Sequence, residues 1–211
     1  IIDSKANLGD NVRIGPYSIV EGDVNIGDNT IIGNHVNIFS DTKIGPDCKI
    51  FHASSIGEIP QDLKFEGEKT QTIIGRGTTI REYVTINKGT SALGETRVGS
   101  GCLLMASTHV AHDCILGDNV IMSNLTTLGG HVEVGHHVNV GWGVGIHQFC
   151  RLGDHCMAAA TATVLQDIPP FFTASGNPAE VRGINKVGLQ RAEFSEEAIS
   201  GVRKAYKQIY K

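Results

Sequence analysis

Large aliphatic residues recur at every sixth position of this chain, and this register constrains the possible folds more than any other feature. From Leu8 to Val164 the register is broken by polar residues at only two positions, Asp62 and Glu68. The position two residues earlier is equally regular and carries small or β-branched residues outside that same stretch. Side chains two residues apart on a strand point to the same side, so both positions face inward.

Each six-residue unit therefore predicts one short strand followed by one corner. Glycine often follows the large aliphatic residue and permits a tight turn, and the chain contains 26 glycines but only 6% aromatic residues. Three such units close a triangular coil, and coils stacked about 4.8 Å apart pair their backbones. The pattern resembles the hexapeptide-repeat family, which implies an all-β, left-handed parallel β-helix shaped as a triangular prism.

The register predicts the domain organisation as well. We expect the β-helix to cover residues 1–170, with loop excursions near 57–71 and 88–97, where polar residues or loop-forming sequence replace the core pattern. Residues 171–211 are expected to form a connecting segment and C-terminal helices, a short one over 184–193 and one capped by Ser195 that runs to about Tyr210. The last helix has no stop signal, so the chain is expected to continue.

Composition narrows the class of protein. There is no apolar run of 18 residues and no leader that combines charge with an apolar stretch, so we expect neither a membrane span nor export. All five cysteines occupy the small inward position, which favours packing, and their odd number favours the reducing cytoplasm. The acidic main body argues against nucleic-acid binding, while the basic residues of 181–211 suit an acidic protein partner.

None of the nine histidines falls on an inward position. Counted in coils of eighteen residues, four of them share one edge of the prism over three successive coils: His109, His112, His131 and His147. The same count stacks His112, Gly130 and Gln148, and it stacks Asp113 and His131. A functional site is expected on this edge. The other five are expected to be solvated corner residues: His35, His52, His136, His137 and His155.

A zinc site is one alternative for these histidines. Hexapeptide-repeat carbonic anhydrases hold zinc with three histidines, two of them spaced as His131 and His136 are here. The third ligand would lie two coils earlier, where this chain has Glu95. Because His131 and His136 fall on different edges, this arrangement is disfavoured within one chain.

The chain resembles a second family far more extensively. Segments along its whole length, in order, are similar to the UDP-N-acetylglucosamine 3-O-acyltransferases of lipid A biosynthesis: 61–64, 68–70, 81–82, 109–114, 129–131, 146–150, 166–170, 176–178 and 188–191. The resemblance implies transfer of an (R)-3-hydroxyacyl chain from acyl carrier protein to the 3-position of a UDP-aminosugar, in a homotrimer. It implies no metal or organic cofactor.

The resemblance also assigns roles to individual residues. His112 matches the family's general base, Asp113 the carboxylate that orients it, and Gly130 the backbone donor to the oxyanion. Ala160 matches the position that limits acyl-chain length, where long-chain members often have glycine. The remaining matches are substrate-binding positions: Gln61, Asp62, Lys64, His109, His131, His147, Gln148 and Arg191. The loop residues among them are expected to complete a site between adjacent subunits, because the loop precedes His112 along the prism axis.

Three alternatives remain open at this point. A sibling N-acyltransferase, which normally has a further domain before its repeats, or an acetyl-CoA-dependent enzyme could share the fold. A non-catalytic scaffold could share it too, but would not need His112 and Gly130 in register.

The trimer is expected because outward small and apolar residues such as Ala106, Trp142 and Ala158 need covering. Acyl-chain length and the choice between a 3-hydroxyl and a 3-amino acceptor are left open.

Overall fold

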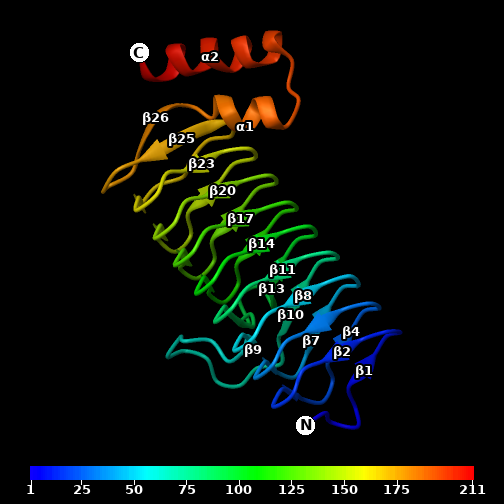
Figure 1. Cartoon of the computed structure of the whole chain (residues 1–211). Helices are drawn as coiled ribbons and strands as arrows, with labels where there is room; N and C mark the ends of the chain where they lie inside the picture. Colours follow the sequence, from blue (N-terminus) through cyan, green and yellow to red (C-terminus); the bar gives the residue numbers. More distant parts are fainter.

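The structure is a computed structural model that describes residues 1–211. Its short strands wind into a triangular prism with a parallel sheet on each side, and two helices lie at the C-terminal end (Figure 1). Most neighbouring strands of a sheet are eighteen residues apart, as in the pairing of Leu8 with Ile26 and of Val98 with Leu116. The six-residue register therefore predicted both the strands and their stacking.

Each sheet is named here by its first strand. The β1 sheet contains β1 (Asn7–Leu8), β4 (Asn25–Ile26), β7 (Thr42–Ile44), β10 (Gln71–Ile74), β13 (Glu95–Val98), β16 (Ile115–Leu116), β19 (Glu133–Val134) and β22 (Arg151–Leu152). The β2 sheet contains β2 (Arg13–Ile14), β5 (Ile31–Ile32), β8 (Lys49–Ile50), β11 (Thr79–Ile80), β14 (Leu103–Leu104), β17 (Ile121–Met122), β20 (Asn139–Val140), β23 (Met157–Ala158), β25 (Phe172–Ser175) and β26 (Glu180–Ile184). The β3 sheet contains β3 (Ile19–Val20), β6 (Asn37–Ile38), β9 (Ser55–Glu58), β12 (Thr85–Asn87), β15 (His109–Val110), β18 (Thr127–Leu128), β21 (Gly145–Ile146) and β24 (Thr163–Val164).

The three edges of the prism are the turns that join these sheets. Edge 1–2 joins the β1 sheet to the β2 sheet, and edges 2–3 and 3–1 follow in chain order. At most corners one residue that is not glycine adopts the left-handed conformation, for example Asp113 on edge 3–1 at φ 59° and Asn119 on edge 1–2 at φ 57°. Because the same corner recurs in each coil, residues eighteen positions apart form columns along an edge.

The core is one continuous cluster along the prism axis, formed by the two inward positions. Inward hydroxyls and thiols bond to glycine carbonyls of the next coil: Thr30 to Gly45 at 3.1 Å, and Cys114 to Gly129 at 3.2 Å. All five cysteines are buried, and burial raises the pKa of the Cys114 thiol to about 12. A thiol with such a pKa is no nucleophile at neutral pH, so the cysteines are packing residues.

Two loops interrupt the coils, and both are shorter than the sequence predicted. One covers 59–70, between β9 and β10, and projects from the side of the prism (Figure 1). The other covers 88–94, between β12 and β13. They lengthen the spacing between paired strands, so Ile44 pairs with Ile74 and Ile74 with Val98. The inward register fails at most positions inside them, since Glu66 and Ala92 are exposed, although Pro60 is buried as the register expects of its position.

The C-terminal segment begins with strands that the sequence did not predict. β25 continues the β2 sheet beside β23, and β26 folds back antiparallel to β25. α1 is shorter than expected, at Lys186–Arg191, whereas α2 spans Glu196–Tyr210 with Ser195 as its N-cap. Neither helix has the length and apolar character that crossing a lipid bilayer requires.

The structure corrects two further expectations about single residues. Ala158 is not an outward residue, because its side chain is fully buried in the core. His155 is not simply a solvated corner residue, because its ring is half-buried and lies 4.7 Å from His137 and 5.0 Å from Phe194. No histidine is fully buried, which confirms that none faces inward.

Candidate active site

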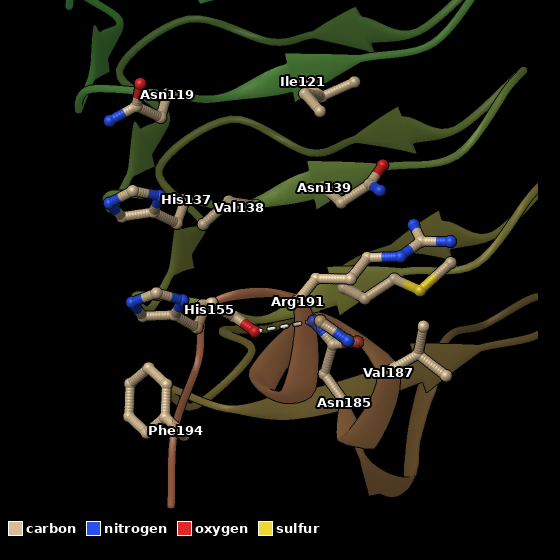
Figure 2. Close-up of a pocket in the computed structure, with 13 residues that line it drawn as sticks. Asn119, Ile121, His137, Val138, Asn139, His155, Asn185, Val187, Arg191 and Phe194 are labelled. Carbon is tan, nitrogen blue, oxygen red and sulfur yellow. Dashed lines mark hydrogen bonds between the residues drawn. The ribbon is translucent and has the colours of Figure 1, made fainter.

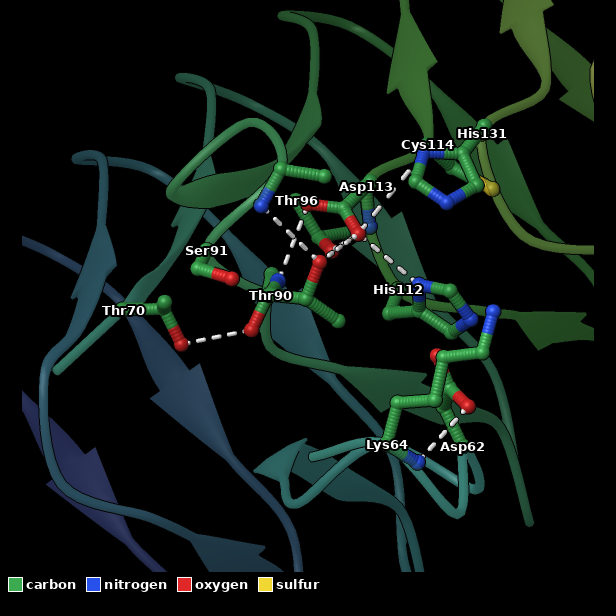
Figure 3. Close-up of polar contacts among 12 residues, drawn as sticks. Asp62, Lys64, Thr70, Thr90, Ser91, Thr96, His112, Asp113, Cys114 and His131 are labelled. Carbon is green, nitrogen blue, oxygen red and sulfur yellow. Dashed lines mark hydrogen bonds and ion pairs between the residues drawn. The ribbon is translucent and has the colours of Figure 1, made fainter. Parts of the chain in front are cut away.

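His112 and Asp113 are adjacent in sequence and form a hydrogen-bonded pair on edge 3–1 (Figure 3). They occupy the turn between β15 and β16, and the left-handed backbone of Asp113 turns its carboxylate toward the imidazole. Nδ1 of His112 lies 2.8 Å from Oδ2 of Asp113, whose side chain is fully buried. An ionised carboxylate only accepts hydrogen bonds, so the proton of neutral His112 lies on Nδ1 and the lone pair on Nε2.

The 88–94 loop keeps this carboxylate ionised. The backbone N–H of Thr90 donates to Oδ1 of Asp113 at 2.9 Å, and the Thr90 hydroxyl donates to Oδ2 at 2.7 Å. Burial by itself raises the pKa of Asp113, but the hydrogen bonds from His112 and Thr90 outweigh burial and bring the pKa below its ordinary value. Asp113 therefore remains a hydrogen-bond acceptor for His112 at neutral pH.

Gly130 lies in the coil that follows His112 and packs against the imidazole ring of His112. A Cβ atom at this position would come within 2.7 Å of both Cε1 and Nε2 of His112, so any larger residue would have to displace the His112 ring. The Gly130 N–H also donates to no protein acceptor, although the residue is buried. A free backbone donor therefore lies next to the basic nitrogen of His112, and the coil count had predicted this stacking.

His131 completes the cluster. Its ring stands edge-on to that of His112 at 5.0 Å and stacks on Phe149 of the following coil at 4.5 Å. On the neighbouring strand, Nδ1 of His109 lies 2.7 Å from the Thr85 hydroxyl. Burial, followed by the nearby charge of His112, lowers the pKa of His109, so His109 is neutral near pH 7. His147 and Gln148 are exposed on the same edge, one coil beyond Gly130.

The 59–70 loop reaches this cluster within the same chain. Asp62, Lys64, Thr90 and His131 line one cavity of 210 Å³ (Figure 3). The expected separation of the loop from the cluster along the prism axis is therefore wrong, because the loop folds back against residues 88–94. Gln61 is exposed at the beginning of the loop and does not line this cavity.

Arg191 lies elsewhere in the subunit. It lines a cavity of 780 Å³ between α1 and the β2 sheet, together with His137, His155 and Asn185 (Figure 2). This cavity adjoins edge 1–2 and shares no lining residue with the cavity beside His131. Ala160 is exposed on the third edge, 2–3. One subunit thus does not bring His112, Arg191 and Ala160 together.

The zinc alternative is not supported by these positions. Glu95 binds Arg97 at 2.7 Å, and Nδ1 of His136 on edge 1–2 accepts the Asp118 N–H, so neither residue meets His131. The ligand atoms of His112, Asp113 and His131 do lie within 4.8 Å of one another. A tetrahedral zinc ion would space nitrogen and oxygen ligands about 3.3 Å apart. The 2.8 Å contact between His112 and Asp113 is instead a hydrogen bond.

Comparison with known proteins identifies the family. The repeat model "Bacterial transferase hexapeptide (six repeats)" matches residues 5–40 and 95–130, and "Udp N-acetylglucosamine O-acyltransferase; Domain 2" matches residues 167–211. The acyl-[acyl-carrier-protein]–UDP-N-acetylglucosamine O-acyltransferase of Herminiimonas arsenicoxydans is 50% identical over 100% of this chain and 81% of its own length. The chain belongs to this acyltransferase family.

Solved structures support the same assignment. The UDP-N-acetylglucosamine O-acyltransferase of Moraxella catarrhalis superimposes with a TM-score of 0.98 at 42% identity, over 100% of this chain and 82% of that one. The UDP-N-acetylglucosamine acyltransferase of Campylobacter jejuni gives 0.96, also at 42% identity and over 100% and 82% of the two chains. These matches confirm the left-handed parallel β-helix with C-terminal helices.

Thr90 is the residue of the cluster that the sequence did not identify. The six-residue register treated it as an ordinary inward position, whereas the structure places it in the 88–94 loop, bonded to Asp113. The loop excursion predicted near 88–97 contains Thr90, but no sequence pattern indicates that this loop contacts Asp113.

Proposed function

We propose that this chain transfers an (R)-3-hydroxyacyl group from acyl carrier protein to the 3-hydroxyl of UDP-N-acetylglucosamine, the first step of lipid A biosynthesis. Membership of the family supports the reaction type. One observation in the structure carries the assignment: Asp113 fixes the proton on Nδ1 of His112, and Nε2 lies beside the unpaired N–H of Gly130.

His112 acts as the general base in this reaction. The sugar 3-hydroxyl attacks the thioester carbonyl while Nε2 of His112 takes its proton. Asp113 holds the ring in position and stabilises the imidazolium that forms, and burial within the cluster strengthens this interaction. When the tetrahedral intermediate collapses, the carbon–sulfur bond breaks, and the thiolate of the carrier's prosthetic group leaves and accepts the proton from His112, which gives the free thiol and neutral His112.

Gly130 stabilises the oxyanion of the tetrahedral intermediate. Its backbone N–H is unpaired in the free protein and is therefore available when negative charge develops on the thioester oxygen. Because the donor is part of a β-helix corner, its position is fixed before the substrate binds. Little reorganisation is then needed during the reaction.

The 59–70 loop and its surroundings bind the nucleotide sugar. Lys64 supplies positive charge for a phosphate, and Asp62 lines the same cavity. Gln61 lies exposed near the beginning of the loop. His109, His131, His147 and Gln148 contact the acceptor or the donor along edge 3–1. Arg191 binds phosphate or the acidic carrier protein, consistent with the positive charge of residues 181–211.

The functional protein is a homotrimer in this proposal. His112 and Ala160 lie on edges 3–1 and 2–3, and Arg191 lies on α1 beside edge 1–2, so packing subunits side by side can bring together what one subunit keeps apart. Exposed apolar side chains support such packing, among them Leu125 at 59% exposed and Trp142 at 56%. Light scattering should give about three times the chain mass of 22.5 kDa, and a monomer at micromolar concentration would refute the trimer.

Ala160 limits the length of the acyl chain. It is exposed in the turn between β23 and β24, and the backbone of this turn lies against Gly141 of the preceding coil. A methyl group in place of the glycine common in long-chain members shortens the available channel. We therefore expect a chain somewhat shorter than the longest in the family.

The proposal is tested by incubating the protein with UDP-N-acetylglucosamine and hydroxyacyl carrier proteins. Mass spectrometry should detect an acylated nucleotide sugar and the free carrier thiol. A 3-amino analogue of the sugar and acetyl-CoA serve as competing acceptor and donor, and preference for either would favour the N-acyltransferase or acetyltransferase alternative. If no combination of acceptor and donor gives a product, the non-catalytic scaffold is the remaining alternative.

A further inference from the structure

Thr90 holds the carboxylate of Asp113 by both of its oxygens. The backbone N–H of Thr90 donates to Oδ1 at 2.9 Å, and its hydroxyl donates to Oδ2 at 2.7 Å (Figure 3). Thr90 is itself 7% exposed, so water cannot easily replace either bond. The two donors together fix the plane of the carboxylate.

The orientation of this plane matters because two histidines face the same oxygen. Nδ1 of His112 lies 2.8 Å from Oδ2 of Asp113, and Nδ1 of His131 lies 3.8 Å from it. A small rotation of the carboxylate would exchange one imidazole for the other. His131 is held in place by its stacking on Phe149, so it remains an available competitor.

We propose that Thr90 is a positioning residue that keeps Asp113 on His112. Its hydroxyl holds Oδ2 against Nδ1 of His112, which keeps the proton on Nδ1 and the lone pair on Nε2. The benefit to catalysis rests on the proposed function, since only acyl transfer requires Nε2 as the base. The pairing of Thr90, Asp113 and His112 does not depend on that function.

The 88–94 loop is built to hold Thr90 in this place. Gly89 accepts a hydrogen bond from the Thr70 hydroxyl, and the Ser91 N–H donates to Glu68 at 3.1 Å. Both partners belong to the 59–70 loop, which also carries Lys64. On the other side, the Asp113 N–H donates to the Thr96 hydroxyl at 2.8 Å. The residues before and after Thr90 are therefore anchored to the loop that is proposed to bind the nucleotide sugar.

The test compares three substitutions in the full chain. Thr90→Val removes the hydroxyl and keeps the shape, and Thr90→Ser keeps the hydroxyl. The matched control is Thr108→Val, because Thr108 is 1% exposed and its hydroxyl has no hydrogen-bond partner. Each variant is measured for kcat and KM, and the protonated ring nitrogen of His112 is read from ¹⁵N chemical shifts at neutral pH.

We expect Thr90→Val to lower kcat by about 10- to 100-fold with little change in KM, because the variant loses one hydrogen bond to a charged group. Its ¹⁵N spectrum should show His112 shifting toward the form with the proton on Nε2. Thr90→Ser and Thr108→Val should retain the wild-type spectrum and most of kcat. Should the valine variant fail to fold, Thr90→Ala carries the same expectation, because it adds no methyl group against the carboxylate.

An unchanged His112 tautomer without the Thr90 hydroxyl overturns the proposal, whatever happens to kcat. So does a serine variant that behaves like the valine variant. If the wild-type protein transfers no acyl group, the proposed function fails, but the ¹⁵N spectra still decide whether Thr90 positions Asp113. The two failures are thus distinguished.

Discussion

Edges 3–1 and 1–2 are built from the same coils, yet the hydrogen-bonded pair of His112 and Asp113, with His131 beside it, lies on edge 3–1. Both have left-handed corner residues at corresponding places, with φ 63° at His131 and 57° at His137. Both stack aromatic rings along the edge, with His131 on Phe149 at 4.5 Å and His137 on His155 at 4.7 Å. Backbone geometry and ring stacking therefore do not distinguish the two edges.

The edges differ in what satisfies the corner N–H groups. On edge 1–2 three successive corner N–H groups are capped by a side chain of the next coil: Asp118 accepts from Ser100 at 2.7 Å, His136 from Asp118 at 2.9 Å, and Asp154 from His136 at 2.7 Å. On edge 3–1 the Gly130 N–H has no such cap, and the 88–94 loop brings Thr90 onto Asp113. A β-helix edge becomes a candidate active site where the caps stop and a loop covers the corner.

The largest expected effect separates His112 from His136. His112→Ala should lower kcat by about 10²–10⁴-fold, because it removes the base, with little loss of thermal stability. His136→Ala should keep kcat and lose about 0.5–1 kcal/mol of stability, because it removes the acceptor for the Asp118 N–H. Steady-state kinetics and thermal melts of both variants measure the contrast. Wild-type activity in His112→Ala would end the assigned mechanism.

Gly130→Ala tests whether the corner beside His112 must lack a side chain. The new methyl group would lie within 2.7 Å of the His112 ring and would displace it from Asp113, so we expect kcat to fall by about 10²-fold. Gly183→Ala is the control, since no atom lies within 4 Å of a Cβ there and its φ is not left-handed. Equal kcat in the two variants would contradict the role given to Gly130.

The regular part of the fold could be predicted because each coil repeats the same local rules. The pairing of Val98 with Leu116 and of Leu116 with Val134 follows from the six-residue register alone. The register also placed Gly130 and Gln148 in one column with His112. Where the spacing departs from eighteen residues, as between Ile74 and Val98, the sequence cannot tell an inward residue from one that has left the core.

The parts that escaped prediction depend on contacts distant in sequence. Thr90 looks like any inward threonine until its loop is seen to fold over Asp113, 23 residues later. Lys64 reaches the cavity beside His131 because the 59–70 loop bends back, which no local pattern specifies. Phe194 covers His155 only because the C-terminal segment returns to the end of the prism.

Lys64→Ala tests whether the 59–70 loop contributes to binding of the nucleotide sugar beside edge 3–1. Loss of a charged partner for a phosphate should raise KM for the nucleotide sugar by about 10-fold and leave kcat nearly unchanged. Lys69→Ala is a matched control in the same loop, because Lys69 is 84% exposed and lies 3.9 Å from Asp41 rather than in the cavity. An unchanged KM in Lys64→Ala would remove the lysine from the binding site.

Ala160 extends the comparison to edge 2–3. Each chain methylene that can no longer be buried forfeits about 0.8 kcal/mol, or roughly fourfold in preference. Ala160→Gly should therefore favour a longer acyl chain and Ala160→Met a shorter one, measured by competition between carrier proteins of graded chain length. The same length preference in both variants would show that Ala160 only occupies a corner.

The smallest effect concerns how edge 1–2 responds to acid. Burial, and then the positive charge of His137, lower the pKa of His155, although Asp154 opposes this. The folded state therefore holds His155 neutral, and its contribution to stability is present above the ordinary pKa of about 6.5 and is lost as the pH falls below it. Asp113 does not contribute in this window, since its lowered pKa keeps it ionised to more acidic pH.

His155→Phe keeps the ring contact with Phe194 and removes the titration, so the fall in Tm between pH 7 and pH 5 should be smaller than in the wild type by roughly 1–3 °C. His35→Phe is the control, because His35 is exposed and stacks only on Tyr17. Parallel Tm curves for the wild type and His155→Phe would mean that edge 1–2 tolerates the charged ring, and that its burial under Phe194 does not distinguish it from an exposed corner.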